Sequence, residues 1–407
     1  MKVLQINCVY GYGSTGEITA DIHRMLLSRG ETSIVCYGRG KRSEQAGVIK
    51  LCGELYAKAN NLRSRFRGIM YGGCFLSTWR LLRILKREKP DVVHLQCING
   101  YFVNHYRLIS WLKERKIKTV LTLHAEFPFT ANCAHALDCT KWKTGCGNCP
   151  RLRQETLSFF LDGTASSFLN MKRSFSGFEE DLTVVSVSPW LQNRAMQSPI
   201  LGKMHHKVIL NGVDTSVFTY RPGSRAGGEW VILHVSAMFS DDPDHLKGGW
   251  FLLELAERLR DLPVRFLVAG KYRLKQPVGE NVTLLGEIRE RDALAKQYAA
   301  ADLTLLTSKR ETFSMVCAES LCCGTPVVGF AAGGPETVSL PDFSEFVPQG
   351  DLDALEAAVR RWMGHKMDKK QIAAAAATHY ARETMLQAYW ELYRGLDDET
   401  EKRHPAD

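Results

Sequence analysis

The sequence alternates short apolar runs with longer amphipathic segments, and this alternation starts again past the middle of the chain. The first β-rich runs cover residues 2–8, 33–37, 91–95, 119–124 and 182–187. After a Pro- and Gly-rich stretch at 220–228 come further runs at 230–235, 264–269, 282–285, 303–306 and 326–330. Strands separated by helices form parallel sheets with helices on both faces. The pattern predicts an α/β protein with two doubly wound domains that face each other across a cleft.

Length and composition agree with such a protein. A chain of 407 residues corresponds to two or three domains of roughly 150 residues each. Its 45% hydrophobic and 24% charged residues exclude general disorder. We find no apolar run near the roughly 18 residues of a membrane-spanning helix and no secretory signal. The 12 cysteines are scattered along the chain, which favours reduced thiols and a cytoplasmic protein.

The formal net charge of +9 is concentrated between residues 58 and 89. The basic residues there include Arg63, Arg65 and Arg67, and aromatic residues such as Phe66 and Trp79 lie between them. One interpretation is a surface that docks on anionic lipid headgroups or polyphosphate. The other is a solvated helix face whose aromatic side chains pack inward. The sequence leaves both open.

Gly11-Tyr-Gly-Ser-Thr-Gly16 follows the first strand and opens a helix, the position of a dinucleotide-binding glycine loop. The acidic residue expected about 20 residues further on is missing, and Arg39 stands near its place. An arginine there suits a 2′-phosphate, so an NADP-dependent oxidoreductase that uses Gly11–Gly16 is an alternative hypothesis.

Two acidic residues flank the start of a helix in the second half of the chain. Glu311 lies in the loop that follows the strand at 303–306, and Glu319 lies inside the following helix. Both can face the carboxyl edge of the sheet, where open α/β sheets bind ligands. The amides at the helix start suit phosphate oxygens. The alternative is one acid that complements the helix dipole and one surface glutamate.

The segment 303–328 resembles the E-x7-E motif of retaining GT-B glycosyltransferases of the group 1 family, or family 4. Further matches to that family occur in order along the chain, at Gly16, His124, Asn211–Asp214 with Phe218, Lys247-Gly248 and Gly333–Glu336. The resemblance implies that Glu311 binds sugar hydroxyls, Glu319 the ribose and Lys247 the diphosphate. It implies His124, Glu311 and Lys247 as catalytic residues, and the remaining donor-binding residues are Gly16, Thr312, Phe313, Ser314 and Met315.

The same resemblance implies an activity and a domain organisation. The expected reaction moves a sugar from a UDP- or GDP-linked donor to a glycan or a polyprenyl-diphosphate-linked acceptor in exopolysaccharide or capsule biosynthesis, without a catalytic cofactor. The expected domains are an acceptor-side domain at 1–206, a donor-binding domain at 207–383 and a C-terminal helix at 384–407 that crosses back to the first. Arg63, Arg65 and Arg67 are expected to bind the acceptor or an anionic membrane surface.

Two positions depart from the family pattern. The arginine that often precedes the Lys-Gly pair is absent, so Lys247 would carry the diphosphate charge, helped by Lys309 or Arg310. Ala125 replaces an aspartate after His124, with Glu126 next to it. The acceptor side is therefore less well defined by sequence than the donor side.

Four cysteines gather within an expected insertion at 131–150, namely Cys133, Cys139, Cys146 and Cys149. A structural zinc ion, held tetrahedrally, is the metal such a set suits. Cys146-Gly-Asn-Cys149 has the usual spacing, whereas Cys133 and Cys139 are further apart than usual. Free thiols and disulfides remain alternatives. No basic recognition helix flanks the cysteines, so we expect no nucleic-acid partner.

Overall fold

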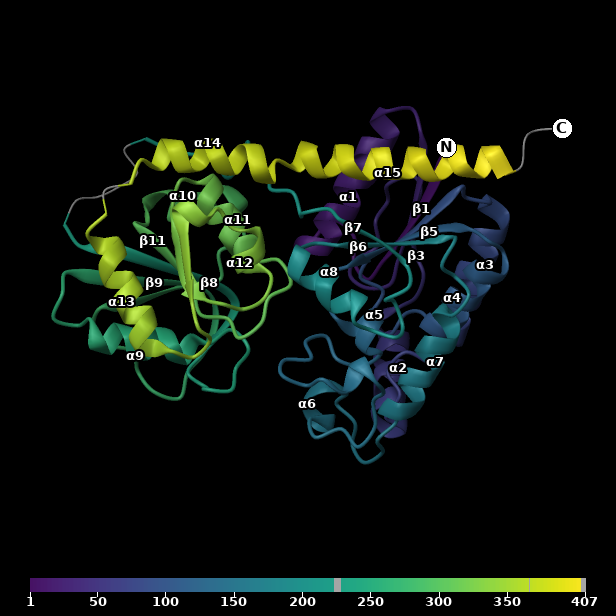
Figure 1. The fold of residues 1–407 in the computed structure, drawn as a ribbon, viewed down its shortest axis with the longest axis horizontal. Coiled ribbons are helices and arrows are strands. Elements are labelled where there is room, and N and C mark those ends of the chain that lie inside the picture. Colours follow the sequence, from purple (N-terminus) through teal and green to yellow (C-terminus); the bar gives the residue numbers. More distant parts are fainter. Residues whose placement is uncertain (223–227, 366, 404–407) are drawn as a thin grey trace. The chain divides into compact units, whose positions relative to one another are not determined.

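The computed structural model describes residues 1–222, 228–365 and 367–403. The chain forms two compact units (Figure 1). The first contains Met1–Ile209 together with the chain from Leu386 onward, and the second contains Leu210–Met385. The Pro- and Gly-rich stretch at 220–228 falls within the second unit, and its residues 223–227 lie outside the described residues.

The first unit is built on a seven-stranded sheet in which every pair of neighbours is parallel. Its strands stand in the order β3-β2-β1-β4-β5-β6-β7. They are β1 (Lys2–Asn7), β2 (Thr32–Tyr37), β3 (Val48–Lys50), β4 (Val92–Leu95), β5 (Lys118–Leu123), β6 (Leu182–Ser186) and β7 (His205–Val208). The helices are α1 (Gly13–Ser28), α2 (Glu54–Arg67), α3 (Phe75–Glu88), α4 (His105–Glu114), α5 (Phe127–Thr130), α6 (Leu152–Glu155), α7 (Thr164–Phe175), α8 (Pro189–Met196) and α15 (Arg382–Arg403).

The second unit has a six-stranded parallel sheet in the order β10-β9-β8-β11-β12-β13. Its strands are β8 (Trp230–Ser240), β9 (Val264–Arg273), β10 (Val282–Gly286), β11 (Leu303–Leu306), β12 (Val327–Phe330) and β13 (Ser344–Val347). Its helices are α9 (Gly249–Arg258), α10 (Arg291–Ala300), α11 (Met315–Cys322), α12 (Pro335–Val338), α13 (Leu352–Met363) and α14 (Lys369–Tyr380). The prediction of two Rossmann-like parallel sheets is confirmed. The short strands β3, β7 and β13 were not expected from the pattern.

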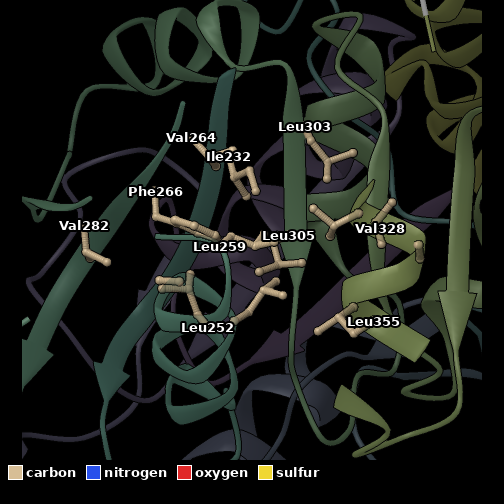
Figure 2. Packing of buried hydrophobic residues seen from close by; sticks show 14 of the residues in the cluster. Ile232, Leu252, Leu259, Val264, Phe266, Val282, Leu303, Leu305, Val328 and Leu355 are labelled. Carbon is tan, nitrogen blue, oxygen red and sulfur yellow. The ribbon is translucent and has the colours of Figure 1, made fainter. Parts of the chain in front are cut away.

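Alternation along β11 shows how helices cover both faces of the second sheet. Leu303 and Leu305 are buried in a cluster with Leu252 and Leu355, which come from α9 and α13 (Figure 2). Thr304 points to the opposite face because successive strand residues alternate. There its hydroxyl accepts a hydrogen bond of 2.7 Å from Ser320 of α11. An apolar run of strand residues thus supports helices on two sides.

Both sheets reverse their strand order at one point. In the first sheet β1 and β4 are neighbours, and in the second β8 and β11 are neighbours. The connections that leave two such strands turn in opposite directions and open a crevice at their carboxyl ends, where open α/β sheets bind ligands. The loops after β8 and β11 are therefore expected to form a ligand site in the second unit.

The C-terminal helix α15 packs on the first unit (Figure 1). The hydroxyl of Tyr393 lies 2.6 Å from Nδ1 of His94, and that of Tyr389 lies 2.9 Å from the hydroxyl of Thr122. All four side chains are buried. Within the described part of the chain, no helix is both long enough and apolar enough to cross a membrane.

Candidate active site

The loops after β8 and β11 bring Lys247 and Glu311 together. Nζ of Lys247 lies 2.6 Å from Oε1 of Glu311, and both side chains are partly exposed. The residues are 64 positions apart in the chain, and they meet because their strands are neighbours in the sheet. A cation and a carboxylate at this edge can contact a ligand that carries both phosphate and hydroxyl groups.

Backbone contacts hold the Lys247 loop against the end of β11. The amide of Lys309 donates to the carbonyl of Leu246 at 2.8 Å, and the hydroxyl of Thr307 donates to the carbonyl of Lys247 at 3.2 Å. Gly248 has a φ of +63°, and a Cβ atom there would lie 2.0 Å from the carbonyl oxygen of Thr307. Only glycine combines this backbone conformation with so close an approach.

A third loop, after β12, fixes the backbone of Glu311 on both sides. The amide of Glu311 donates to Ala332 at 3.0 Å, and its carbonyl accepts from Gly334 at 2.9 Å. The Glu336 carboxylate in turn accepts hydrogen bonds from the amides of Ala332 and Gly333. A Cβ atom on Gly334 would lie 2.4 Å from the carbonyl carbon of Thr312. The Gly333–Glu336 segment therefore positions the acidic loop.

The start of α11 follows directly after Glu311. Ser314 caps this helix by accepting a hydrogen bond of 3.3 Å from the amide of Cys317. Its φ of +79° is unusual for a residue with a side chain. The side chain of Phe313 is buried near the ring of Tyr380, so only its backbone can face a ligand. Thr312 and Met315 are partly exposed. The helix amino end thus lies beside the Lys247–Glu311 pair.

Glu319 lies one turn inside α11, in the helix where the sequence predicted it. Its Oε2 accepts a hydrogen bond of 3.3 Å from the hydroxyl of Tyr298. Burial raises the pKa of Glu319 to about 7, against the opposing charge of Arg291. Such a carboxyl group can both accept and donate hydrogen bonds near neutral pH.

In the first unit, His124 follows β5 and is partly buried. Its Nε2 lies 3.0 Å from Oε1 of Gln96, which follows β4. Burial lowers the pKa of His124 to about 4, so the ring is neutral near pH 7 and donates its Nε2 proton to the Gln96 oxygen. Gln96 itself donates to Gln5 of β1 at 3.1 Å. Sequence reasoning missed Gln96, which no local pattern marks.

The glycine loop lies after β1 at the reversal point of the first sheet. Gly16 belongs to the first turn of α1, and its carbonyl accepts a hydrogen bond of 3.0 Å from the amide of Gly11. A Cβ atom on Gly16 would lie 3.1 Å from the side chain of Val9. Asn7 ties this loop down by donating to the carbonyls of Val9 and Thr15. Gly16 keeps the loop tight.

Glu126 follows Ala125, which stands where the family pattern has an aspartate. Its contacts are those of a residue that stabilises the fold. Its side chain is fully buried, and its Oε2 lies 2.6 Å from Nη2 of Arg194 in α8. The guanidinium of Arg194 also lies 4.9 Å from the ring of Trp142. Glu126 accepts a further hydrogen bond from the amide of Ala136. This pair anchors the cysteine-rich segment, and sequence reasoning did not identify Arg194.

The cysteine-rich segment contains free and partly buried thiols. The pKa of Cys133 is raised by burial first and then by the nearby charges of Glu155, Cys149, Cys146 and Cys139. The four sulfur atoms therefore lie in one neighbourhood. Over residues 1–222, 228–365 and 367–403, no three His, Cys, Asp or Glu side chains are grouped so as to hold a metal ion. The structural zinc site stays a prediction.

The basic residues of α2 differ in their contacts. Arg65 is partly buried, and its Nε donates to the carbonyl of Leu157 at 3.0 Å. Arg63 and Arg67 are exposed. Tyr71 packs inward, whereas Phe66 and Trp79 are about half exposed, at 52% each. Both sequence interpretations thus hold in part: some aromatic side chains of this stretch are core residues and others face solvent.

Comparisons with known proteins show the family to which the chain belongs. Residues 16–217 match the model described as Glycosyltransferase Family 4, and residues 229–365 match the model described as Glycosyl transferases group 1. The protein named as a colanic acid biosynthesis glycosyl transferase, WcaC, of Escherichia coli (strain K12) is 29% identical, over 97% of this chain and 100% of its own. A D-inositol 3-phosphate glycosyltransferase of Xylanimonas cellulosilytica is 46% identical, over 37% of this chain and 40% of its own.

Solved glycosyltransferase structures share the fold. Sucrose-phosphate synthase from Thermosynechococcus elongatus superimposes with a TM-score of 0.69 at 16% identity, over 97% of this chain and 99% of that one. HepE of Anabaena, solved in complex with UDP-glucose, gives a TM-score of 0.61 at 15% identity, over 97% of this chain and 100% of that one. The NADP-dependent oxidoreductase hypothesis for the glycine loop is thereby set aside. The chain belongs to the family 4 (group 1) glycosyltransferases and has their GT-B fold.

Proposed function

We propose that this glycosyltransferase moves a hexosyl group from a UDP- or GDP-linked sugar to a hydroxyl of a glycan acceptor, with retention at the anomeric carbon. The observation that carries the proposal is the contact between Lys247 and Glu311 at the reversal point of the second sheet. The complexes of HepE with UDP and UDP-glucose support a nucleotide-sugar donor.

The main energetic problem of the reaction is charge. The sugar leaves as a cation-like centre while negative charge grows on the diphosphate. Lys247 and the amides at the start of α11 would stabilise this diphosphate, and preorganised donors of this kind contribute about 3–4 kcal/mol each. Since no arginine precedes the Lys-Gly pair, Lys247 is the principal cation, and Lys309 and Arg310 lie in the adjoining loop.

Glu311 would accept hydrogen bonds from the sugar hydroxyls and fix the orientation of the ring. Its ion pair with Lys247 keeps both groups in place before the donor binds. Glu319 would hydrogen-bond the ribose, with Tyr298 supporting its carboxyl group. Gly16 would allow the first-unit loop to approach the donor closely.

The acceptor hydroxyl would lose its proton to the leaving phosphate. A neutral His124 suits a hydrogen bond to the sugar's exocyclic hydroxymethyl group or to the acceptor, and does not suit a cationic role, because its pKa is lowered to about 4. We propose no catalytic metal, since Lys247 and the helix amides supply the positive charge that the diphosphate needs.

The acceptor is proposed to be a glycan linked to a polyprenyl diphosphate, in exopolysaccharide or capsule biosynthesis. The name of WcaC, which refers to colanic acid biosynthesis, supports this class of product. Such an acceptor lies in a membrane, so we propose a cytoplasmic protein that binds peripherally to an anionic membrane surface through α2 and α3. The net charge of +9 and the exposed Arg63 and Arg67 support that contact.

The test combines donor binding with one variant. Calorimetry against UDP-, GDP- and ADP-sugars identifies the donor, and turnover is then measured for Glu311→Ala. We expect turnover to be abolished while thermal unfolding stays close to wild type. The matched control is Glu280→Ala, which removes an exposed glutamate outside the site and should leave turnover unchanged. A Glu311→Ala rate within about threefold of wild type, a loss under roughly 0.7 kcal/mol, would refute the assignment.

A further inference from the structure

Helix α2 presents an apolar stripe to solvent. Only Ala57 and Ser64 of its 14 residues are buried. Leu55, Leu62 and Phe66, at relative positions i, i+7 and i+11, are 81%, 50% and 52% exposed. This spacing puts the three side chains on one side of the helix. A surface helix normally turns such a stripe to the core, so this stripe is available to an apolar partner.

Beside this stripe lies a cavity of about 180 Å³. It lies between α2, the segment 69–74 and residues of α4 and α7. Arg63 and Arg67 line it from consecutive turns of α2, and Asn60, Tyr101, Tyr106 and Asn170 contribute neutral polar groups. Of the described residues that line the cavity, none is acidic. The charge of the cavity is therefore that of two guanidinium groups.

These two arginines are available for an anion. Over the described ranges neither forms an ion pair with a carboxylate. Arg63 stacks on the ring of Phe75 at 5.3 Å, a contact that orients a guanidinium and leaves its edge donors free to bind. Arginine forks match phosphate oxygens in geometry as well as in charge. The cavity is thus suited to a phosphate-containing head group.

Three exposed apolar side chains follow or contact segments that line the cavity, and we call these three the rim. Phe75 and Leu76, at the start of α3, are 44% and 71% exposed, and Phe160 is 80% exposed. The segment that carries Phe160 packs closely on the end of α2. A Cβ atom on Gly68 would lie only 2.1 Å from the carbonyl oxygen of Leu161. The amide of Phe159 also donates to the carbonyl of Arg65 at 2.9 Å. The exposed aromatic side chain belongs to a fixed surface.

We propose that this cavity binds the diphosphate of a lipid-linked diphosphate, with the lipid chain lying on the apolar stripe and rim. A diphosphate diester carries two negative charges, which the two arginines match, whereas the phosphodiester of a bilayer phospholipid carries one. The cavity is smaller than the roughly 300–1,000 Å³ of pockets that enclose a whole drug-sized ligand. It therefore takes the head group and leaves the chain outside. The binding of a lipid diphosphate is argued from the cavity itself. Only the idea that this lipid carries the acceptor glycan rests on the proposed function.

The test measures binding of farnesyl diphosphate, a soluble lipid diphosphate, by titration calorimetry. The double variant Arg63→Gln/Arg67→Gln removes the charge of the cavity. Its matched control is Arg83→Gln/Lys86→Gln, which removes two exposed positive charges from α3 that do not line the cavity. We expect the dissociation constant to rise at least tenfold in the first variant and less than twofold in the control. Inorganic pyrophosphate, which lacks the chain, should bind the wild-type protein at least tenfold more weakly than farnesyl diphosphate.

Three results would overturn the proposal: no binding of farnesyl diphosphate to the wild-type protein, equal losses in the two variants, or equal affinity for pyrophosphate. Flotation with phosphatidylglycerol vesicles distinguishes binding of bilayer phospholipid from binding of a lipid diphosphate. If Arg63→Gln/Arg67→Gln abolishes flotation but leaves farnesyl diphosphate binding intact, the cavity binds phospholipid and the proposal is wrong. UDP titration of the same variants should be unchanged, because the donor site lies in the second unit. Failure of the wild-type protein to bind UDP, with its farnesyl diphosphate binding intact, would count against the proposed function alone.

Discussion

Replacing Gly248 by alanine tests whether the position of Lys247 controls turnover. Gly248 has a φ of +63°, and a Cβ atom on it would lie 2.0 Å from the carbonyl oxygen of Thr307. Heavy atoms in ordinary contact stay about 3.5 Å apart, so the Lys247 loop and the end of β11 must separate by roughly 1.5 Å. That movement pulls Nζ of Lys247 away from Glu311.

Two costs are expected in this variant. A left-handed backbone costs a residue with a side chain about 1–2 kcal/mol. A misplacement of about 1 Å at a reacting group costs on the order of 10²-fold in rate, or about 2.7 kcal/mol of transition-state stabilisation. Gly286→Ala is the matched control, because Gly286 has a φ of +73° and its Cβ atom would meet nothing within 4 Å. The control variant therefore carries the backbone cost alone.

The assay is kcat/KM with the donor identified by calorimetry, together with thermal unfolding of both variants. We expect each variant to lose a few degrees of Tm, with the larger loss in Gly248→Ala. Only Gly248→Ala should lose about 100-fold in kcat/KM. If its kcat/KM and Tm match those of Gly286→Ala, the close approach at Thr307 does not position Lys247 and the reasoning fails.

Two further predictions concern a carboxyl group and the cysteines. Burial raises the pKa of Glu319 from 4.5 to about 7, so between these values the folded chain keeps a proton that the unfolded chain has lost, and stability falls as pH rises. Glu319→Gln should flatten this fall by about 1–2 kcal/mol in urea unfolding between pH 5 and 7, and parallel curves for the two proteins would contradict it. For Cys133, Cys139, Cys146 and Cys149, metal analysis of protein purified without added zinc should find about one zinc per chain, and a folded, metal-free protein would rule the site out.

The fold could be predicted because its determinants are local. Each apolar run between helical segments became a parallel strand, since a strand covered on both faces needs a continuous apolar sequence. Glu311 could be located for the same reason, because it follows a predicted strand and open α/β sheets bind ligands at the carboxyl ends of their strands. Lys247 was located only by its resemblance to the Lys-Gly pair of the family. The strand β13 was not predicted, because Ser344–Val347 is only four residues long and contains a serine and a glutamate.

The rest depends on contacts between distant residues that no local pattern marks. Gln96 reaches His124 across 28 positions, and Arg194 reaches Glu126 across 68. Whether an aromatic side chain in a basic stretch is buried also depends on its neighbours in space. Tyr71 stacks on His105 at 4.3 Å, whereas Phe66, five residues earlier, is half exposed. Nothing in the sequence around Tyr71 and Phe66 indicates which of the two side chains is buried.

The Lys247–Glu311 contact bears on how the proposed donor site would bind a diphosphate without the arginine that often precedes the Lys-Gly pair. A lysine side chain without a partner is flexible, and it would lose conformational entropy when it binds a diphosphate. Here Glu311 holds Nζ at 2.6 Å, and the Gly333–Glu336 segment holds the backbone of Glu311. The cation is therefore ordered before the donor binds, so its stabilisation of developing charge needs little reorganisation. In the proposed donor site, this order would offset part of the loss of the second cation.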